Sequence, residues 1–219
     1  MATVSIPHNH FQSVSFELKR FTQVTMLAGG RTQIREYAPS RWMAQYRTAP
    51  LTEAQRRAFM VFFSQVADGT NNFLGYDPSA AVPVAYAANG GGLTFPAVGS
   101  WPYGVIGVGR AEIVGPFTIT LSAMPVGFTV APGDMVSLEW YGAWWLLRLT
   151  TGGTFTGAPF NVDVEPRIPY PTPFPTGTQV AAYWYFPPSL MLLEPDSVQH
   201  IAEAGQMPSI SFSAFQKVL

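Results

Sequence analysis

Apolar and polar residues alternate along the first part of the chain with the period of two that marks a β-strand. The pattern predicts one strand over residues 14–19 and a second over 24–26. Residues 27–30 end in two glycines, which reach positive φ without steric cost and therefore predict a turn. A returning strand is predicted over 32–37, and Pro39 is expected to end it. The segment is thus expected to form antiparallel β structure.

Residues 41–78 combine a strand, a capped helix and a second strand. Thr52 and Gln55 have the spacing of a capping box, and Gly69 is placed to end the helix. Apolar helix residues recur at i, i+3, i+4 and i+7, so they share one face that must be covered by a sheet. The predicted structural core of this region consists of Trp42, Phe59, Phe62, Phe63, Val66 and Phe73.

The middle of the chain contains short apolar segments separated by turn residues, which predicts a compact β-barrel or sandwich. Residues 87–100 are expected to form an extended hairpin or a loop. The proline-rich stretch 169–175 is expected to be a loop or an edge, because proline lacks the amide donor of a central strand. The predicted strands cover residues 111–113, 117–121, 135–140, 144–149, 160–164 and 179–186.

The end of the chain returns to the pattern of its beginning. It predicts a buried strand over 190–193, one or two helical turns over 197–204, and a final strand over 209–213. The predicted fold is mainly β, a β-rich α+β protein with an antiparallel sheet or sandwich, one packed helix and an inserted small β-barrel. Residues 1–80 with 187–219 would form the sheet domain, and residues 81–186 the inserted domain.

Composition narrows the class of protein. Charged residues make up 11% of the 219 positions, well below the roughly 25% of typical soluble domains, so much of the surface must be uncharged or buried against partners. A net charge of −1 argues against a nucleic-acid binder. Residues 1–77 carry eight Lys/Arg against five Asp/Glu, and residues 78–219 carry four against eight. This asymmetry suits head-to-tail contact between copies, although an uneven placement of charges with no functional cause explains it as well.

The chain has no cysteine, which excludes disulfides and thiolate chemistry and fits assembly in a reducing cytosol. The N-terminus lacks the charged and apolar regions of a secretory signal. No apolar run approaches 18 residues, so no stable membrane insertion is expected.

Few residues carry candidate chemistry. His8 and His10 could bind a metal, but no third ligand has suitable spacing, and His200 is isolated. Asp163 and Glu165 share a strand face and could supply the acid and base of a glycan hydrolase, although a solvated strand face is the simpler interpretation. No nucleophile elbow or phosphate-binding loop occurs. We therefore expect no enzyme, with no catalytic, metal-binding or cofactor-binding residues.

Aromatic residues suggest an alternative function. Trp144, Trp145 and Trp184, if exposed, could stack on sugars and make the chain a β-rich carbohydrate-binding module. Core packing or contact between subunits would use the same residues.

Several motifs occur in a characteristic order. They are Ser40-Arg41-Trp42, Leu51-Thr52-Glu53, Gly69-Thr70-Asn71-Asn72-Phe73 and Asp77-Pro78. This order resembles the N-terminal region of distal tail and related tail-tip proteins of long-tailed bacteriophages and phage-like gene transfer particles. Residues 132–147 and 162–168 are similar to the inserted barrel of that family, and residues 209–216 resemble its final strand. Residues 87–110 match nothing in it.

The resemblance implies a ring, usually a hexamer, that joins the tail tube to the hub or receptor-binding tip in the baseplate region. The sheet and helix would build a tube-like belt, and the inserted barrel would be OB-like. The implied partners are other copies of the chain, the tail tube protein and the hub or tip proteins, and DNA would pass through the lumen only as cargo. The implied location is the distal tail of the virion, after assembly in the host cytoplasm.

Overall fold

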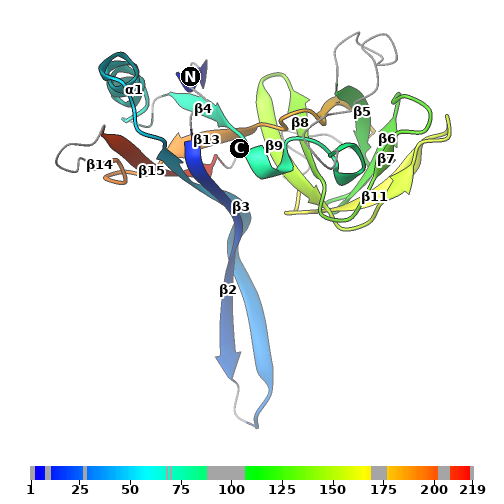
Figure 1. The fold of residues 1–219 in the computed structure, drawn as a ribbon. Helices are drawn as coiled ribbons and strands as arrows, with labels where there is room; N and C mark the ends of the chain where they lie inside the picture. The colour runs from blue at the N-terminus through cyan, green and yellow to red at the C-terminus, as the bar shows by residue number, and fades with distance from the viewer. Residues whose placement is uncertain are drawn as a thin grey trace.

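The computed structural model describes residues 3–7, 11–26, 29–67, 69, 71–87, 107–168, 177–201 and 208–217. The chain forms a sheet covered by a helix, a closed β-barrel beside it, and a two-stranded arm that extends away from both (Figure 1). The predicted fold class, a mainly β protein with one packed helix and a small barrel, is confirmed. Apart from Ala87, the segments predicted at 87–100 and 169–175 lie outside the described residues.

Seven of the described strands form the sheet, in the order β1-β4-β13-β15-β3-β2, with β14 also paired to β15. β1 lies parallel to β4, and the other neighbours are antiparallel. Both ends of the chain contribute strands. The strands are β1 (Thr3–Val4), β2 (Phe11–Met26), β3 (Thr32–Thr48), β4 (Asn72–Gly75), β13 (Ser189–Leu193), β14 (Gln199–Ile201) and β15 (Ser209–Gln216).

The prediction of separate strands before Pro39 and after it is wrong, because β2 and β3 are each continuous. Pro39 and Ser40 of β3 lie opposite the single residue Arg20 of β2, between the pairs Lys19–Arg41 and Phe21–Ala38. This arrangement is a β-bulge. Pro39 has no backbone amide to donate, and at a bulge the hydrogen-bond ladder does not need one. β15 pairs with β3 only at residues 43–47, so Pro39 has no partner strand on that side either.

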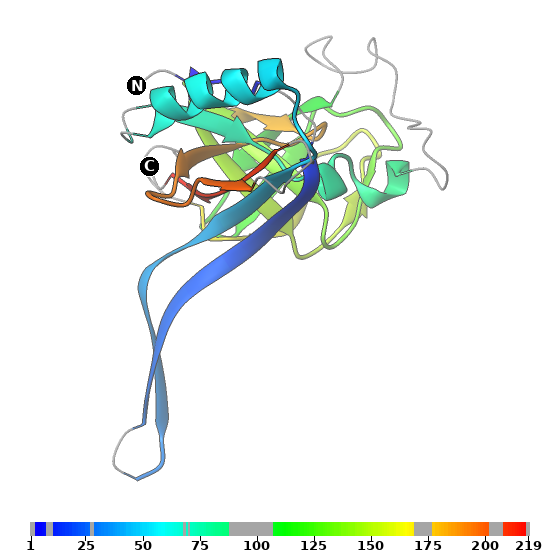
Figure 2. The same cartoon turned by 60° about the vertical axis from the view of Figure 1, so that its left-hand side comes forward.

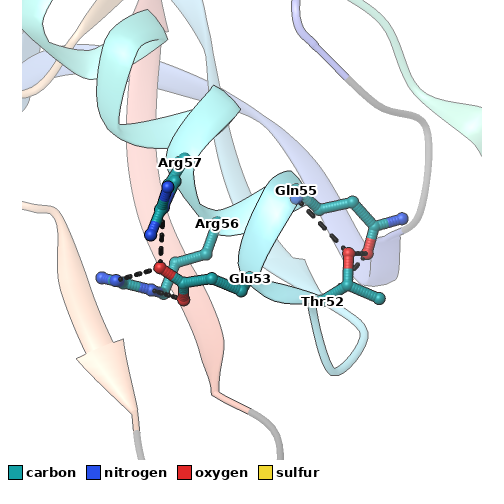
Figure 3. A network of polar contacts seen from close by, with 5 residues as sticks. All are labelled: Thr52, Glu53, Gln55, Arg56 and Arg57. Carbon is teal, nitrogen blue, oxygen red and sulfur yellow. Dashed lines mark hydrogen bonds and ion pairs between the residues drawn. The ribbon is translucent and has the colours of Figure 1, made fainter.

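Helix α1 (Glu53–Val66) has the predicted capping box. The Gln55 amide donates to the Thr52 hydroxyl at 3.4 Å, and the Thr52 amide donates to Gln55 Oε1 at 2.9 Å (Figure 3). Glu53 accepts from Arg56 and Arg57 at 2.9 Å each, and these bonds hold the pKa of its carboxyl down at about 2. At the other end Gly69, with a φ of +64°, donates to Val66 O at 3.2 Å. Both ends of the helix are therefore set by local sequence.

The core between α1 and the sheet is built largely from aromatic rings. Tyr46 stacks on Phe212 at a centroid distance of 4.9 Å, and Phe62 meets Phe73 at 5.4 Å. Gly75 leaves room for this packing, since a Cβ there would collide with the Tyr46 hydroxyl. The six residues predicted for the core are all buried: Trp42, Phe59, Phe62, Phe63, Val66 and Phe73.

The barrel closes through six strands in the order β11-β6-β5-β12-β8-β9. An OB fold has five strands and this barrel has six, so the OB-like topology stays a prediction. Two further strands, β7 (Thr129–Val130) and β10 (Gly153–Thr154), pair outside the barrel. Two short 3-10 helices, η1 (Pro78–Ala80) and η2 (Val84–Tyr86), follow β4 in the chain. The barrel strands are β5 (Val108–Ile113), β6 (Thr118–Ser122), β8 (Met135–Trp140), β9 (Ala143–Leu149), β11 (Phe160–Glu165) and β12 (Gln179–Tyr183).

The helical turns predicted at 197–204 are wrong where the structure describes this segment. Residues 199–201 form β14, which pairs with Ser209–Ser211 of β15. The Ser197 hydroxyl donates to the Glu194 carbonyl at 2.7 Å and accepts from the Ser213 amide at 3.1 Å, which fixes the turn before the strand. Pairing with an existing strand supplies backbone bonds that a single polar helical turn cannot supply, so the tertiary context decides the local conformation.

Trp42 joins the sheet to the barrel. Its side chain is 1% exposed and packs with Met135 and Leu146 of the barrel and with Phe16 and Leu18 of β2. Its indole Nε1 donates to the Leu146 carbonyl at 2.9 Å. The predicted core residue is therefore a contact between two parts of the fold.

Candidate functional site

The β2–β3 arm is the part of the described chain that has the least support from the rest of the fold. We define the arm as residues 22–26 of β2 and 32–37 of β3. β15 leaves β3 at Met43, and from there to the tip each strand of the arm has the other as its neighbour in the described sheet. Figures 1 and 2 show the arm extending well beyond the sheet and the barrel. An isolated two-stranded hairpin is marginally stable in water, so this arm is expected to gain stability from a partner.

The exposed apolar residues of the arm lie on one face, which we call the apolar face; it also carries the polar residues Thr22, Thr32 and Glu36. Val24 lies opposite Ile34, and Met26 lies opposite Thr32, so these residues share a face. The exposed fractions are 61% for Val24, 80% for Met26 and 68% for Ile34.

The other face of the arm carries polar side chains. Gln23 is paired with Arg35, and Thr25 is paired with Gln33. All four residues are exposed. An exposed apolar strip backed by a polar face is typical of an interaction surface and not of a free end.

The root of the arm is held by aromatic and cationic side chains. Phe21 meets Tyr37 edge-on at a centroid distance of 6.0 Å. The Arg41 guanidinium lies over the rings of Phe21 and Phe215, at 5.1 and 4.4 Å. These contacts begin where β15 ends, so they stiffen the arm at the point where it leaves the sheet.

Among the described strands, β1 and β2 are the two ends of the sheet. β2 forms one edge over its full length of 16 residues, whereas β1 at the other edge has only two. An exposed edge strand presents unpaired backbone donors and acceptors that can pair with another chain. The sheet face opposite α1 has a polar row of Ser15, Gln45 and Ser213 across β2, β3 and β15.

The carboxylates considered for glycan hydrolysis lie on β11, on the outside of the barrel. Asp163 accepts from the Thr118 hydroxyl at 2.9 Å, and Glu165 accepts from Arg20 at 2.7 Å and from Arg148 Nε at 3.0 Å. Burial alone would raise the pKa of Glu165, but the bonds and charges of Arg148 and Arg20 outweigh it and hold the pKa below its usual value. A general acid for glycosidic cleavage needs the opposite shift. The arrangement therefore favours a structural ion-pair network.

Asp134, a residue of the turn before β8, has a structural environment. Its carboxylate accepts from the amides of Val84 at 2.8 Å and Ala131 at 2.7 Å. Burial raises the pKa of this carboxyl, and the two amide bonds partly counter the effect. The residue ties η2 to the barrel.

Two of the three tryptophans proposed for sugar binding are inside the barrel. Trp145 is 1% exposed and Trp184 is fully buried, so neither presents a face to a ligand. Trp144 is half-buried on the outer face, where its ring lies 4.8 Å from Tyr183. The expected platform of exposed tryptophans is thus reduced to one indole beside one phenol.

The remaining candidates form no cluster in the part of the chain that the structure describes. His200 is exposed on β14, and His8 and His10 lie outside the described residues. Among described residues, no group of three metal-ligating side chains comes together. None of the described helices is long and apolar enough to cross a membrane.

Comparison with known proteins adds no assignment: the sequence matches no family model and no curated protein. The arm itself is partly visible in the sequence, because alternating residues and a Gly-Gly turn predict a hairpin. Its separation from the sheet was not predicted. The contact between Arg20 and Glu165, which are 145 positions apart, has no sequence signal either.

Proposed function

We propose that this chain is a structural virion protein whose copies form a ring at the distal end of a phage tail. The ring, hexameric by resemblance, would link the tail tube to the hub or receptor-binding tip. The observation that carries the proposal is the arm, whose apolar face of Val24, Met26 and Ile34 has no covering residues in the described part of the chain.

The open sheet supports association between copies. α1 covers one face of the sheet, so growth of the sheet is available at its two edges, β1 and β2. These edges differ from each other, and contact between unlike surfaces is head-to-tail. Head-to-tail contacts generate a closed ring when the rotation between copies closes.

Sequence features support the same proposal. Only 11% of residues are charged, which suits a chain that buries much of its surface against neighbours. The order of motifs from Ser40 to Pro78 resembles tail-tip proteins, and this resemblance supplies the phage context. On this proposal the partners are other copies, the tail tube protein and the hub or tip proteins, and DNA passes through the lumen as cargo.

The proposal is tested by measuring the mass of the purified chain with size-exclusion chromatography and light scattering, followed by electron microscopy. We expect a concentration-dependent ring with one main copy number, and the same protein at the tail end of purified particles. A chain that stays monomeric at high concentration and is absent from particles would refute the proposal.

The contribution of the arm is tested with a matched pair of variants. Val24→Thr, Met26→Gln and Ile34→Thr together remove the apolar face. Gln23→Ser, Thr25→Ser and Gln33→Ser together alter the polar face to the same extent.

Burying a large apolar side chain contributes about 1.5–3 kcal/mol, and these three are already about one-third hidden. We expect the apolar-face variant to weaken assembly by about 100-fold or more, and the polar-face variant by about tenfold at most. Equal effects of the two variants would mean that the apolar face is not the contact.

A further inference from the structure

We infer that Glu165 is a positioning residue that fixes the direction of the arm relative to the barrel. Glu165 is the last residue of β11, and its two carboxylate oxygens have different partners. Oε2 accepts from Nη2 of Arg20, on β2, at 2.7 Å. Oε1 accepts from Nε of Arg148, on β9, at 3.0 Å. One carboxylate therefore ties a strand of the arm root to two strands of the barrel.

The position of Arg20 on β2 makes this contact effective. Arg20 lies opposite the bulge formed by Pro39 and Ser40, beyond the point where β15 supports β3. A bulge bends a strand and raises its local twist, and a second register shift follows at Tyr37, so the direction of the arm is set over residues 20–22 of β2 and 36–40 of β3. The Arg20–Glu165 ion pair therefore restrains the arm where its strands bend.

Trp42 supplies the second point of attachment. It lies opposite Leu18 in the register of β2 and β3, two residues closer to the sheet than Arg20. Its indole is bonded to the Leu146 carbonyl, and the Arg148 guanidinium lies 5.6 Å from its ring centre. A single attachment at Trp42 would leave the arm able to turn about it. The second attachment at Arg20 removes that freedom.

Close packing does not provide the same restraint. A groove of about 200 Å³ separates the arm root from the barrel, and its lining includes Glu36, Phe117 and Arg167 as well as Arg20 and Glu165. Space of this kind would allow the arm to move toward or away from the barrel. The Arg20–Glu165 ion pair joins the two sides of the groove and holds them at one separation.

Arg148 holds the Glu165 carboxylate in position before Arg20 binds it. The two residues are paired across β9 and β11, and Arg148 keeps the carboxylate ionised and oriented on the outside of the barrel. Arg20, whose side chain is 64% exposed, then meets an acceptor that is already in place. An acceptor held in advance costs less conformational entropy on pairing than two mobile side chains.

The consequence for assembly rests on the proposed function. A rotation between neighbours that is the same at every contact is needed for a ring to close with one copy number. If the arm reaches the neighbouring copy, its direction contributes to that rotation. Loss of the Glu165 contact is then expected to broaden the distribution of copy numbers and to leave the arm surface itself intact.

The inference is tested within a single chain, so its outcome does not depend on ring formation. The sequence has no cysteine, so Thr25→Cys on the arm and Thr156→Cys in the loop between β10 and β11 place two spin labels at known sites. Labelled chains are diluted with an excess of unlabelled chains, and the distance distribution is measured by double electron–electron resonance. We expect one narrow distribution in the otherwise native chain.

Three variants are compared in this labelled background. Glu165→Gln and Arg20→Gln should each broaden the distribution at least twofold, and the double variant should be no broader than either single one. Asp163→Asn, on the same strand but bonded to Thr118, is the matched control and should leave the width unchanged.

Circular dichroism confirms that each variant is folded. If Glu165→Gln does not fold, the exposed Arg20→Gln variant decides the question. Unchanged widths in folded variants would overturn the inference, and so would equal broadening by Asp163→Asn. A chain that keeps a narrow distribution but never forms rings would instead refute the proposed function alone.

Discussion

Replacing Trp42 tests whether the sheet and the barrel share a packed contact. The indole is 1% exposed and forms a buried cluster with Met135 and Leu146, against which Phe16 and Leu18 pack. Trp42→Ala removes this packing, and large-to-small substitutions of buried aromatic residues cost about 3–5 kcal/mol of unfolding free energy. Trp42→Phe keeps most of the apolar contact and removes the bond to the Leu146 carbonyl, which is 2.9 Å long. Its expected cost is about 1–2 kcal/mol, the value of one hydrogen bond with an acceptor left unpaired.

The two substitutions separate packing from hydrogen bonding. Urea unfolding is followed by far-UV circular dichroism, because this signal does not depend on the fluorescence of the replaced residue. Tyr141→Ala is the control, since Tyr141 is 90% exposed at the turn after β8 and its loss should change stability by about 0.5 kcal/mol or less. A cost below about 1 kcal/mol for Trp42→Ala would refute the packed contact. Equal costs for the Ala and Phe variants would mean that the hydrogen bond, and not packing, carries the stabilisation.

Three further substitutions test other parts of the argument. Phe62→Ala, at a side chain that is 2% exposed, should cost about 3–5 kcal/mol in urea unfolding, and a cost below about 1 kcal/mol would mean that another helix face covers the sheet. Gly75→Ala should cost about 1–3 kcal/mol because its Cβ would collide with the Tyr46 hydroxyl, whereas Gly115→Ala, with open space around it, should be nearly neutral. Glu165→Gln should reduce the pH dependence of stability. The folded-state pKa of Glu165 lies below its usual value of 4.5, so its contribution is present above that pH and is lost as the pH falls through the folded-state pKa. The difference between wild type and Glu165→Gln in urea midpoint should therefore be larger at pH 7 than at pH 3, and an equal difference at both would show that the ionised carboxylate makes no contribution.

Local signals predicted the helix well. Thr52, Gln55 and Gly69 set its ends through bonds to neighbouring backbone groups, and such bonds depend on spacing alone. Four of the six barrel strands lie within one residue of their predicted bounds, whereas β5 begins and β12 ends three residues earlier than predicted. Turn residues such as Gly133 and Gly142, both with positive φ, flank β8 and mark its ends.

Features that depend on distant partners were not predictable in the same way. Residues 199–201 are polar and short, and they become a strand because β15 offers an edge to pair with. Pro39 is accommodated because a bulge opposite Arg20 removes the need for its amide. Trp145 and Trp184 belong to the barrel core, although a sequence cannot distinguish a core indole from one that faces a ligand. In each case the deciding contact comes from another strand of the fold.

The tip of the arm connects the sequence pattern with the proposed function. Alternation at Val24, Met26 and Ile34 predicts a strand with one buried face, yet these residues are 61–80% exposed. No described part of the chain covers this face. On an arm surrounded by water, gathering three apolar residues on one side would bring no stabilisation. The pattern is physically consistent if another chain covers the apolar face, and for this reason the arm, and not a pocket, carries the proposal of an assembling protein.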